Sequence, residues 1–333
     1  MTRIMINGFG RIGRTLLRQL LTDPAHADLE LVAINDIASP EMCAYLFRYD
    51  SVFGPYPGTV TEEPGALVID GCRIPFHTTR DLRELDLSHV DVVLECTGAA
   101  SNRPHAEAGL LAGAKSVLLS GPSEAADVTC VLGANEDEIG DARIVSNASC
   151  TTNAIAPMLK ALDARFGIDR AHVTTIHCYT GSQPTVDAPG ASYERSRAAA
   201  VSMVPTSTSA AKQVIKVLPG LDHRLSVTAV RVPCISVSAV DAVLQLDTMP
   251  EDANAALSDL FTGSPLVGLT GDPCVSTDLR ARPESLVLST RETRVVEGGQ
   301  LRLFGWYDNE WGFSARMLDM TRRMAARRSS NRV

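Results

Sequence analysis

Short apolar runs alternate with amphipathic stretches through the first half of the chain. The apolar runs predict strands at residues 3–6, 29–34, 92–94 and 116–119, and the spacing at 104–112 predicts a helix. Strands and helices that alternate in this way build a doubly wound, mostly parallel sheet. We therefore expect an α/β domain in this half of the chain.

The pattern changes near residue 150. The segments 224–232 and 235–246 are β-rich, long and closely spaced, which is typical of an antiparallel sheet. Residues 181–197 contain Pro184, Pro189 and Gly190 and have little periodicity, so we expect a long functional or interface loop there. A final amphipathic run at 313–326 predicts a helix.

A glycine-rich turn joins the first predicted strand to a helix. Gly8, Gly10 and Gly13 have the spacing of a dinucleotide-binding turn, in which the second glycine lets the backbone approach a pyrophosphate. Asp36 follows the next predicted strand, where an acidic side chain binds ribose hydroxyls and repels a 2′-phosphate. The glycines alone fit a tight turn in any α/β protein. Together with Asp36 they predict a Rossmann domain that prefers NAD to NADP.

A single cysteine stands at the start of another predicted helix. Cys150 lies in the polar run 149–153, just before an apolar helical stretch. Free N–H groups and the helix macrodipole stabilise a thiolate, so we expect a lowered pKa for the Cys150 thiol and a nucleophile at this position. His177, in a later β-rich segment, is suited to act as its base. The alternative for Cys150 is a buried, inert thiol.

Further landmarks follow in a fixed order along the chain. They are the segments 7–13, 49–52, 95–98, 149–153, His177, 205–208, 231–233 and 306–312. With these landmarks the sequence resembles, along essentially its whole length, the phosphorylating glyceraldehyde-3-phosphate dehydrogenase family. The resemblance implies a Rossmann NAD-binding domain at residues 1–149 and 312–333, with the last helix folded back onto it. It also implies an α+β catalytic domain with a mainly antiparallel sheet at residues 150–311.

The resemblance implies a glycolytic-type reaction as well, in which glyceraldehyde 3-phosphate, NAD and inorganic phosphate give 1,3-bisphosphoglycerate. Cys150 would attack the aldehyde, His177 would remove the proton, and phosphate would cleave the resulting thioester. The family positions that match a cofactor contact are Gly8, Gly10, Arg11, Ile12, Gly13, Asp36, Arg80, Thr97, Ser120 and Asn309.

Two anion sites are implied, one for the phosphate group of the substrate and one for the attacking phosphate. Thr180, Arg231 and Arg195 match the first site. The second site is matched by Ser149, Thr151 and Thr208, with Ser209 beside them. Hydroxyls and a guanidinium are suited to orient phosphate oxygens. Hydroxyl-rich turns and a salt bridge at a strand end are the plainer interpretations of these residues.

Several residues depart from the family pattern in the substrate half. Glu194 precedes Arg195 where a basic doublet is usual, Ser209 occupies a usual glycine position, and Cys178 replaces a usual alanine after His177. These departures favour a second hypothesis, a paralogue that acts on erythrose 4-phosphate or another phosphorylated or phosphonylated aldehyde. A third hypothesis is a non-catalytic protein that uses the cleft to bind nucleotides or RNA.

Composition limits the partners. The chain of 333 residues has a net charge of −8 and 45% hydrophobic residues, which gives no overall attraction to nucleic acid or anionic membranes. Its eight cysteines have no metal-like spacing, so we expect neither a metal site nor disulfides. The opening residues show no targeting segment, and we expect a cytoplasmic protein. The resemblance adds the expectation of a homotetramer.

Overall fold

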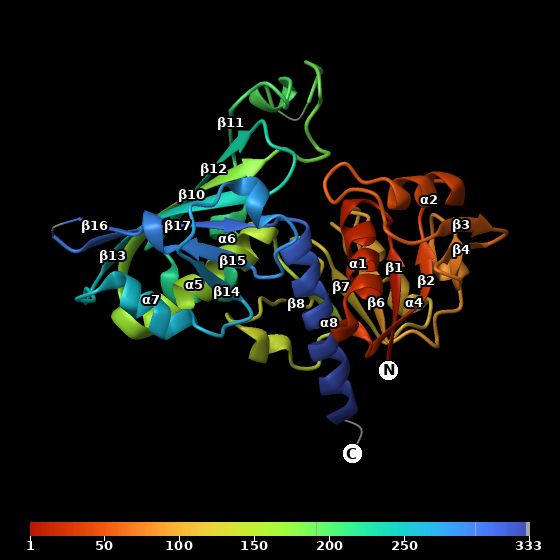
Figure 1. The fold of residues 1–333 in the computed structure, drawn as a ribbon. Coiled ribbons are helices and arrows are strands. Elements are labelled where there is room, and N and C mark those ends of the chain that lie inside the picture. The colour runs from red at the N-terminus through yellow and green to blue at the C-terminus, as the bar shows by residue number, and fades with distance from the viewer. Residues whose placement is uncertain (191, 297, 331–333) are drawn as a thin grey trace. The chain divides into compact units, whose positions relative to one another are not determined.

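The computed structural model describes residues 1–190, 192–296 and 298–330, which form two compact units. The first unit contains Met1–Cys130, Glu136–Ala148 and the chain from Ser314 onward, and the second contains Val131–Asn135 and Ser149–Phe313. Figure 1 shows both units with most of their helices and strands labelled. The expected boundaries placed 131–135 in the first unit, whereas these residues pack with the second. Lys160 of the second unit donates a hydrogen bond to the carbonyl of Ala134 at 2.6 Å.

The first unit is built on a nine-stranded sheet of the order β3-β4-β5-β2-β1-β6-β7-β9-β8. Its strands are β1 (Thr2–Asn7), β2 (Leu29–Asn35), β3 (Val60–Glu63), β4 (Ala66–Ile69), β5 (Cys72–His77), β6 (Val92–Glu95), β7 (Ser116–Leu119), β8 (Val128–Thr129) and β9 (Ile144–Ser146). All pairs from β5 to β8 along this order are parallel, and β3, β4 and β5 are joined by antiparallel pairs. The expected doubly wound domain is therefore confirmed.

The helices of the first unit are α1 (Arg11–Thr22), α2 (Pro40–Arg48), α3 (Arg103–Ala106), α4 (Ala108–Leu111) and most of α8 (Trp311–Ser330), with 3₁₀ turns at Pro24–His26, Leu82–Glu84 and Glu136–Ile139. The middle residues of the central strands are apolar, as is typical of a parallel sheet covered on both faces, and Ile4, Met5 and Ile6 of β1 are fully buried.

The single helix expected at 104–112 is wrong. The structure has the two short helices α3 and α4, which meet at Glu107. Pro104 lies in the first turn of α3. Gly109 lies in α4, where an added Cβ would come within 3.1 Å of Val93 and 3.2 Å of Val117. Gly109 lowers the helix propensity but lets the backbone approach the sheet closely.

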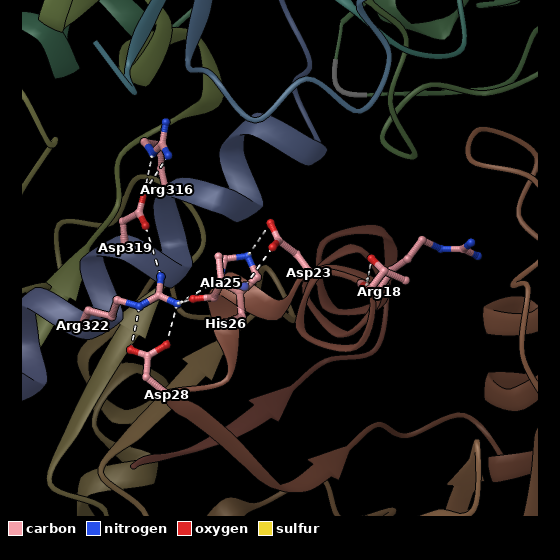
Figure 2. A network of polar contacts seen from close by, with 9 residues as sticks. Arg18, Asp23, Ala25, His26, Asp28, Arg316, Asp319 and Arg322 are labelled. Carbon is pink, nitrogen blue, oxygen red and sulfur yellow. Dashed lines mark hydrogen bonds and ion pairs between the residues drawn. The ribbon is translucent and has the colours of Figure 1, made fainter. Parts of the chain in front are cut away.

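Arg322 fixes α8 within the first unit (Figure 2). Its guanidinium donates two hydrogen bonds of 2.8 Å to the carboxylate of Asp28 and one of 3.2 Å to Asp319. It also donates to the carbonyl of Ala25 at 3.0 Å and lies 2.9 Å from Nδ1 of His26. Burial lowers the pKa of His26, and the Arg322 charge lowers it further. This neutral imidazole can therefore accept a hydrogen bond from Arg322.

The second unit is built on a mixed sheet of the order β11-β12-β10-β13-β17-β15-β14, with β16 paired to β17. Its strands are β10 (Ile168–Cys178), β11 (Val204–Thr206), β12 (Leu225–Val232), β13 (Ser238–Leu246), β14 (Val267–Thr270), β15 (Leu286–Ser289), β16 (Arg294–Val296) and β17 (Gln300–Tyr307). The β10–β12 and β14–β15 pairs are parallel, and the other described pairs are antiparallel. The expected mainly antiparallel sheet is confirmed.

The helices of the second unit are α5 (Cys150–Phe166), α6 (Ala210–Val217) and α7 (Ala253–Phe261), with 3₁₀ turns at Glu194–Ser196, Pro219–Leu221, Ser276–Leu279 and Thr290–Glu292. The strand expected from residue 235 begins only at Ser238, because Val237 has a φ of +64°, which no regular strand contains. Residues 181–190 and 192–197 form the expected irregular loop, apart from the turn at Glu194–Ser196. Among the described residues, no helix combines the length and apolarity needed to cross a membrane.

Candidate active site

The first unit contains a cleft of about 540 Å³ at the carboxyl ends of β1, β2 and β6. This is the edge of a doubly wound sheet at which nucleotides bind. Five of the residues predicted to contact a cofactor line it: Gly8, Gly10, Asp36, Arg80 and Thr97. Arg11, Ile12, Gly13 and Ser120 do not line it, and Asn309 belongs to the second unit.

A glycine is required at each of the three positions of the turn for a different steric reason. Gly8 has a φ of +94°, and a Cβ on it would lie 2.6 Å from the amide nitrogen of Thr97. A Cβ on Gly13 would collide with the carbonyl oxygen of Gly8. A Cβ on Gly10 would meet no protein atom within 4 Å, so this position is open toward a ligand. Gly10 immediately precedes the N-terminus of α1, whose free N–H groups suit a pyrophosphate, and the turn therefore fits a dinucleotide.

Backbone hydrogen bonds hold Asp36 at the edge of this cleft. Its carboxylate accepts from the amide of Phe9 at 2.6 Å and from the amide of Ala38 at 2.8 Å. Each oxygen retains a lone pair that can accept a ribose hydroxyl. Arg11, by contrast, turns its guanidinium to Asp50 in an ion pair and lies over the ring of Phe53, so its side chain has a structural role.

A buried polar network supports the cleft, and sequence reasoning did not predict it. The Glu95 carboxylate accepts hydrogen bonds from Asn7 and from Thr97, whose amide donates at 2.9 Å. The Asn7 oxygen accepts from Asn35 at 2.8 Å, and the Asn35 oxygen accepts from the amide of Thr79 at 3.0 Å. Burial raises the pKa of Glu95. The available signal was positional, because Asn7 and Glu95 each end a strand next to a cofactor motif.

The second unit brings Cys150 and His177 together. Ser149 caps α5 by accepting a hydrogen bond from the amide of Thr152 at 3.1 Å, which makes Cys150 the first residue of the helix. His177 is near the end of β10, and its Nε2 lies 3.5 Å from the Cys150 sulfur. This pairing of a thiol with an imidazole is the arrangement that sequence reasoning predicted.

The protonation state of the pair differs from the expected one. Burial raises the pKa of the Cys150 thiol, although the Arg231 charge and the amide groups at the start of α5 act in the opposite direction. The expectation of a lowered thiol pKa is therefore wrong for this state, because loss of solvent outweighs the helix terminus. Burial and the nearby Arg231 charge lower the pKa of His177 to about 4. Both shifts act toward the uncharged thiol and the uncharged imidazole.

Tyr307 is a site residue that the sequence did not single out. Its hydroxyl lies 2.9 Å from the hydroxyl of Thr151 and 2.7 Å from that of Thr175. Its ring meets the His177 ring edge-on at 5.9 Å. Tyr307 thus joins the start of α5 to β10. The backbone N–H and the hydroxyl of Thr151 also approach the Cys150 thiol, where both lower its pKa.

Arg231, predicted to bind phosphate, lies directly behind His177. Its Nη1 is 2.7 Å from His177 Nδ1 and donates to the carbonyl of Cys178 at 2.8 Å. Its Nε is buried, and no described atom accepts a hydrogen bond from it. Arg231 is therefore a cation close enough to lower the pKa of the thiol, with an Nε that can still donate to an anionic substrate.

The other predicted phosphate residues lie in loops of the same unit. The Thr180 hydroxyl is 3.0 Å from that of Ser182, and Thr208 accepts from the amide of Ala210 at 3.1 Å. Ser209 is exposed at the start of α6, and Arg195 lies in the Glu194–Ser196 turn. No hydrogen bond between described residues joins these four to Cys150 or His177. Glu194 is exposed, and hydrogen bonds from its own backbone and Ser192 lower its pKa.

Asn309 is held by two side-chain donors. Its Oδ1 accepts from the Cys178 thiol at 3.2 Å and from the Ser238 hydroxyl at 3.3 Å. The Ser238 hydroxyl oxygen accepts a hydrogen bond from the amide of Cys178 at 3.2 Å, so its own hydrogen is the one that it donates to Asn309. This arrangement leaves the NH₂ group of Asn309 as the free end of the amide. Cys178, a departure from the family pattern, is thus part of the Asn309 site.

A dinucleotide cleft and a cysteine thiol in contact with an imidazole together define the class of nicotinamide-dependent dehydrogenases that work through a cysteine. Comparison with known proteins identifies the family. Residues 2–103 match the model of the glyceraldehyde 3-phosphate dehydrogenase NAD binding domain, and residues 149–309 match that of the C-terminal domain. The chain belongs to the glyceraldehyde-3-phosphate dehydrogenase family.

Individual relatives agree over nearly the full length. The glyceraldehyde-3-phosphate dehydrogenase of Cereibacter sphaeroides is 46% identical over 324 residues, which cover 95% of this chain and 96% of the relative. That of Zymomonas mobilis is 45% identical over 332 residues, with 97% and 98% covered. That of Pseudomonas aeruginosa is 44% identical over 331 residues, with 98% and 99% covered.

Proposed function

We propose that this protein is an NAD-dependent, phosphorylating glyceraldehyde-3-phosphate dehydrogenase. The substrates are glyceraldehyde 3-phosphate, NAD and inorganic phosphate, and the products are 1,3-bisphosphoglycerate, NADH and a proton. The observation that carries the proposal is the contact of 3.5 Å between the Cys150 sulfur and His177 Nε2 at the start of α5, in a chain of this family.

Cys150 and His177 perform the covalent steps in this proposal. The Cys150 sulfur bonds to the aldehyde carbon while its proton passes to His177 Nε2. The oxygen of the resulting hemithioacetal is stabilised by the backbone N–H of Cys150 and by the imidazolium N–H of His177. NAD, when bound, supplies the acceptor for the hydride. His177 passes its added proton to that oxygen, which becomes the hydroxyl of the hemithioacetal, and takes the same proton back as the hydride leaves. A thioester on Cys150 results.

Inorganic phosphate then completes the cycle. A phosphate oxygen attacks the thioester carbon, the carbon–sulfur bond breaks, and the acyl phosphate leaves with Cys150 restored. The hydroxyls of Ser149 and Thr208 and the N–H of Thr151 orient the attacking phosphate, while Arg231 and Thr180 bind the phosphate group of the substrate, with Arg195 beside them. Asp36 and Gly10 hold the ribose and pyrophosphate of NAD, and Asn309 binds its carboxamide through the free NH₂ group.

Assembly and location are part of the same proposal. Four apolar side chains on or near the 181–197 loop are 71–94% exposed: Val186, Tyr193, Val201 and Met203. Apolar side chains this exposed support burial against another copy of the chain, and we propose a homotetramer. All eight cysteines are free, which supports a reducing compartment such as the cytoplasm.

Substrate choice is tested by comparing two aldehydes. We expect kcat/KM for glyceraldehyde 3-phosphate to exceed that for erythrose 4-phosphate, with both rates dependent on inorganic phosphate or arsenate. A higher kcat/KM for erythrose 4-phosphate would move the assignment to the second hypothesis, in which Glu194 and Ser209 have changed the aldehyde pocket. NAD reduction that needs no phosphate would exclude a phosphorylating enzyme of either kind.

A further inference from the structure

The ends of three neighbouring strands in the first unit carry buried polar side chains that bond to one another. Asn7 ends β1, Asn35 ends β2 and Glu95 ends β6. Each of them lines the cofactor cleft, yet each side chain is only 4–7% exposed. Buried polar groups are costly unless their hydrogen bonds are satisfied, so the direction of every bond among these three residues matters.

The backbone of Thr79 fixes the direction of the bonds at one end of this network. Its N–H donates to Oδ1 of Asn35 at 3.0 Å, and its carbonyl accepts from Nδ2 of the same side chain at 3.0 Å. Nδ2 of Asn35 also donates to Oδ1 of Asn7 at 2.8 Å. The NH₂ group of Asn7 therefore faces Glu95, and an NH₂ group can only donate.

Thr97 makes the same demand on Glu95 from the other side. Its N–H donates to Oε1 of Glu95 at 2.9 Å, and its hydroxyl donates to the same oxygen. That hydroxyl accepts from the amide of Ala99 at 3.1 Å, so its own hydrogen is the one that it donates to Glu95. Burial raises the pKa of Glu95, and the bonds from Thr97 and Asn7 oppose that shift. Residue 95 must thus accept at both of its terminal atoms, which a carboxylate does and a glutamine amide cannot.

The network joins segments that line different parts of the cleft. Thr79 follows β5 and Thr97 follows β6, and β2 and β1 separate these two strands in the sheet. Gly8 follows β1 between them, where its N–H donates to the carbonyl of Asn35 at 2.8 Å and a Cβ on it would lie 2.6 Å from the nitrogen of Thr97. Gly8, Thr79, Arg80 and Thr97 all line the cleft. The hydrogen bonds beneath them therefore set the spacing of these segments.

We propose that Glu95 is a positioning residue for NAD, which acts through Asn7 and Asn35 and takes no part in the chemical steps. By accepting at both oxygens, Glu95 keeps Thr97, the Gly8 turn and the segment that follows β5 at the spacing that the dinucleotide needs. Loss of either acceptor leaves a buried donor unpaired, and the segments shift to relieve it. This inference rests on the proposed function for the identity of the cofactor and concerns the binding of that cofactor alone.

The test is the dissociation constant of NAD for the full chain, measured by isothermal titration calorimetry with neither aldehyde nor phosphate present. Glu95→Gln places an NH₂ group against a donor, either Asn7 or Thr97. We expect the dissociation constant to rise by about tenfold, the effect of one unpaired buried donor. Asn7→Asp sets two carboxylates against each other and is expected to weaken binding at least as much.

Combining the two substitutions restores every bond of the network. In the double variant Asn7→Asp with Glu95→Gln, the new amide at position 95 donates to the new carboxylate at position 7, and its oxygen still accepts from Thr97. The carboxylate at position 7 still accepts from Asn35. The net charge is unchanged, so we expect the affinity for NAD to return to within about twofold of the wild type, a strong departure from additivity. Glu30→Gln makes the same exchange at an exposed glutamate of β2 and is the matched control, with unchanged affinity expected.

Wild-type affinity for NAD in folded Glu95→Gln would overturn the proposal, whatever the loss of stability, because the network would then serve the fold alone. A double variant that binds NAD as weakly as the single variants would overturn it as well.

A further variant covers the case in which Glu95→Gln does not fold. Asn35→Ala breaks the network at Thr79 and leaves Asn7 paired with Glu95. We expect it to weaken NAD binding by a similar factor, and unchanged affinity would overturn the proposal. Because binding is measured without turnover, these outcomes are distinct from failure of the proposed function, which would show as absent NAD reduction by a wild-type protein that binds NAD.

Discussion

His177 is enclosed so tightly that its imidazole stays neutral well below the usual range. Its side chain is buried, and the Arg231 charge adds to the effect, so its pKa falls to about 4. The Cys150 thiol has a raised pKa in the same surroundings. The surroundings of the pair thus oppose a charge on either group.

The lowered pKa of His177 has a consequence for acid stability. Below pH 6.5 the unfolded chain binds a proton at this residue that the folded chain does not bind until about pH 4. The contribution of His177 to the free energy of unfolding is thus complete above pH 6.5 and is lost as the pH falls toward 4. The loss is on the order of 2–3 kcal/mol by linkage.

Chemical unfolding at pH 7 and pH 4.5 checks this expectation. The free energy of unfolding should change less between these two pH values in His177→Asn than in the wild type, by on the order of 2–3 kcal/mol. His223→Asn, which changes an exposed histidine, should leave the difference unaltered. Equal pH dependence in His177→Asn and the wild type would show that His177 is not a buried neutral group.

Cys178 links the catalytic histidine to the proposed carboxamide contact. Replacing it by alanine leaves Oδ1 of Asn309 with the single donor Ser238. Loss of one such hydrogen bond costs on the order of 1 kcal/mol, so we expect KM for NAD to rise by about threefold to tenfold with kcat nearly unchanged. Cys178→Ser keeps a donor and should restore most of the affinity. Cys72→Ala, at an exposed position, is the control, and an unchanged KM in Cys178→Ala would refute the linkage.

The last helix is held within the first unit by the contacts of Arg322 (Figure 2). Arg322→Ala removes the pair of hydrogen bonds to Asp28 and the bond to the carbonyl of Ala25. We expect the free energy of unfolding to fall by about 2 kcal/mol, because charge-assisted bonds at a partly buried site are worth more than an exposed ion pair. Chemical or thermal unfolding measures the change.

Arg327 of the same helix provides the control for Arg322. It pairs at 3.4 Å with Asp137, whose side chain is 88% exposed. Arg327→Ala should therefore change the free energy of unfolding by less than about 0.5 kcal/mol. Equal losses in the two variants would mean that the Arg322 contacts add nothing specific.

Sequence patterns predicted correctly those helices and strands for which the local preference and the packing in the folded protein favour the same conformation. The β1–turn–α1 segment was predicted because glycine spacing and apolar runs act within a few residues of each other. The segment 104–112 was predicted as one helix but forms two short ones. Its apolar spacing is helical, whereas Gly109 lets the backbone approach the sheet closely and weakens the helix, which the spacing does not reveal. Strand β13 starts late because the turn before it needs a positive φ at Val237, for which the sequence carries no signal.

Only part of the candidate site was predictable from the sequence. Cys150 was found from a helix start and His177 from a β-rich segment that follows it, and the structure places them in contact. The direction of the thiol pKa shift was missed because it depends on burial by distant segments. The Glu95 network and Tyr307 were missed for the same reason, since their partners are far away in the sequence.

Assembly of the whole molecule is expected to depend on the exposed apolar side chains of the loop region. Tyr193 and Val201 are 94% and 80% exposed in the single chain. If they are covered by other copies, replacing both by aspartate should place charges in an interface and lower the association state. Light scattering should give the mass of four chains for the wild type and a smaller mass for the double variant.

Replacement of Ile37 provides the control for assembly. Ile37 is 63% exposed in the first unit, so Ile37→Asp should leave the mass unchanged. A wild-type mass of one chain at micromolar concentration would contradict the homotetramer. An unaltered tetramer in the double variant would place the interface elsewhere.

The thioester on Cys150 is the central claim, and a pre-steady-state experiment tests it most directly. Mixing the protein with NAD and glyceraldehyde 3-phosphate in the absence of phosphate should release a burst of about one NADH per chain and then nearly stop, because the acyl group stays on the sulfur. Added phosphate should restore continuous turnover, and Cys150→Ser should show neither burst nor turnover. Continuous NADH formation without phosphate, or a burst that survives in Cys150→Ser, would contradict the account.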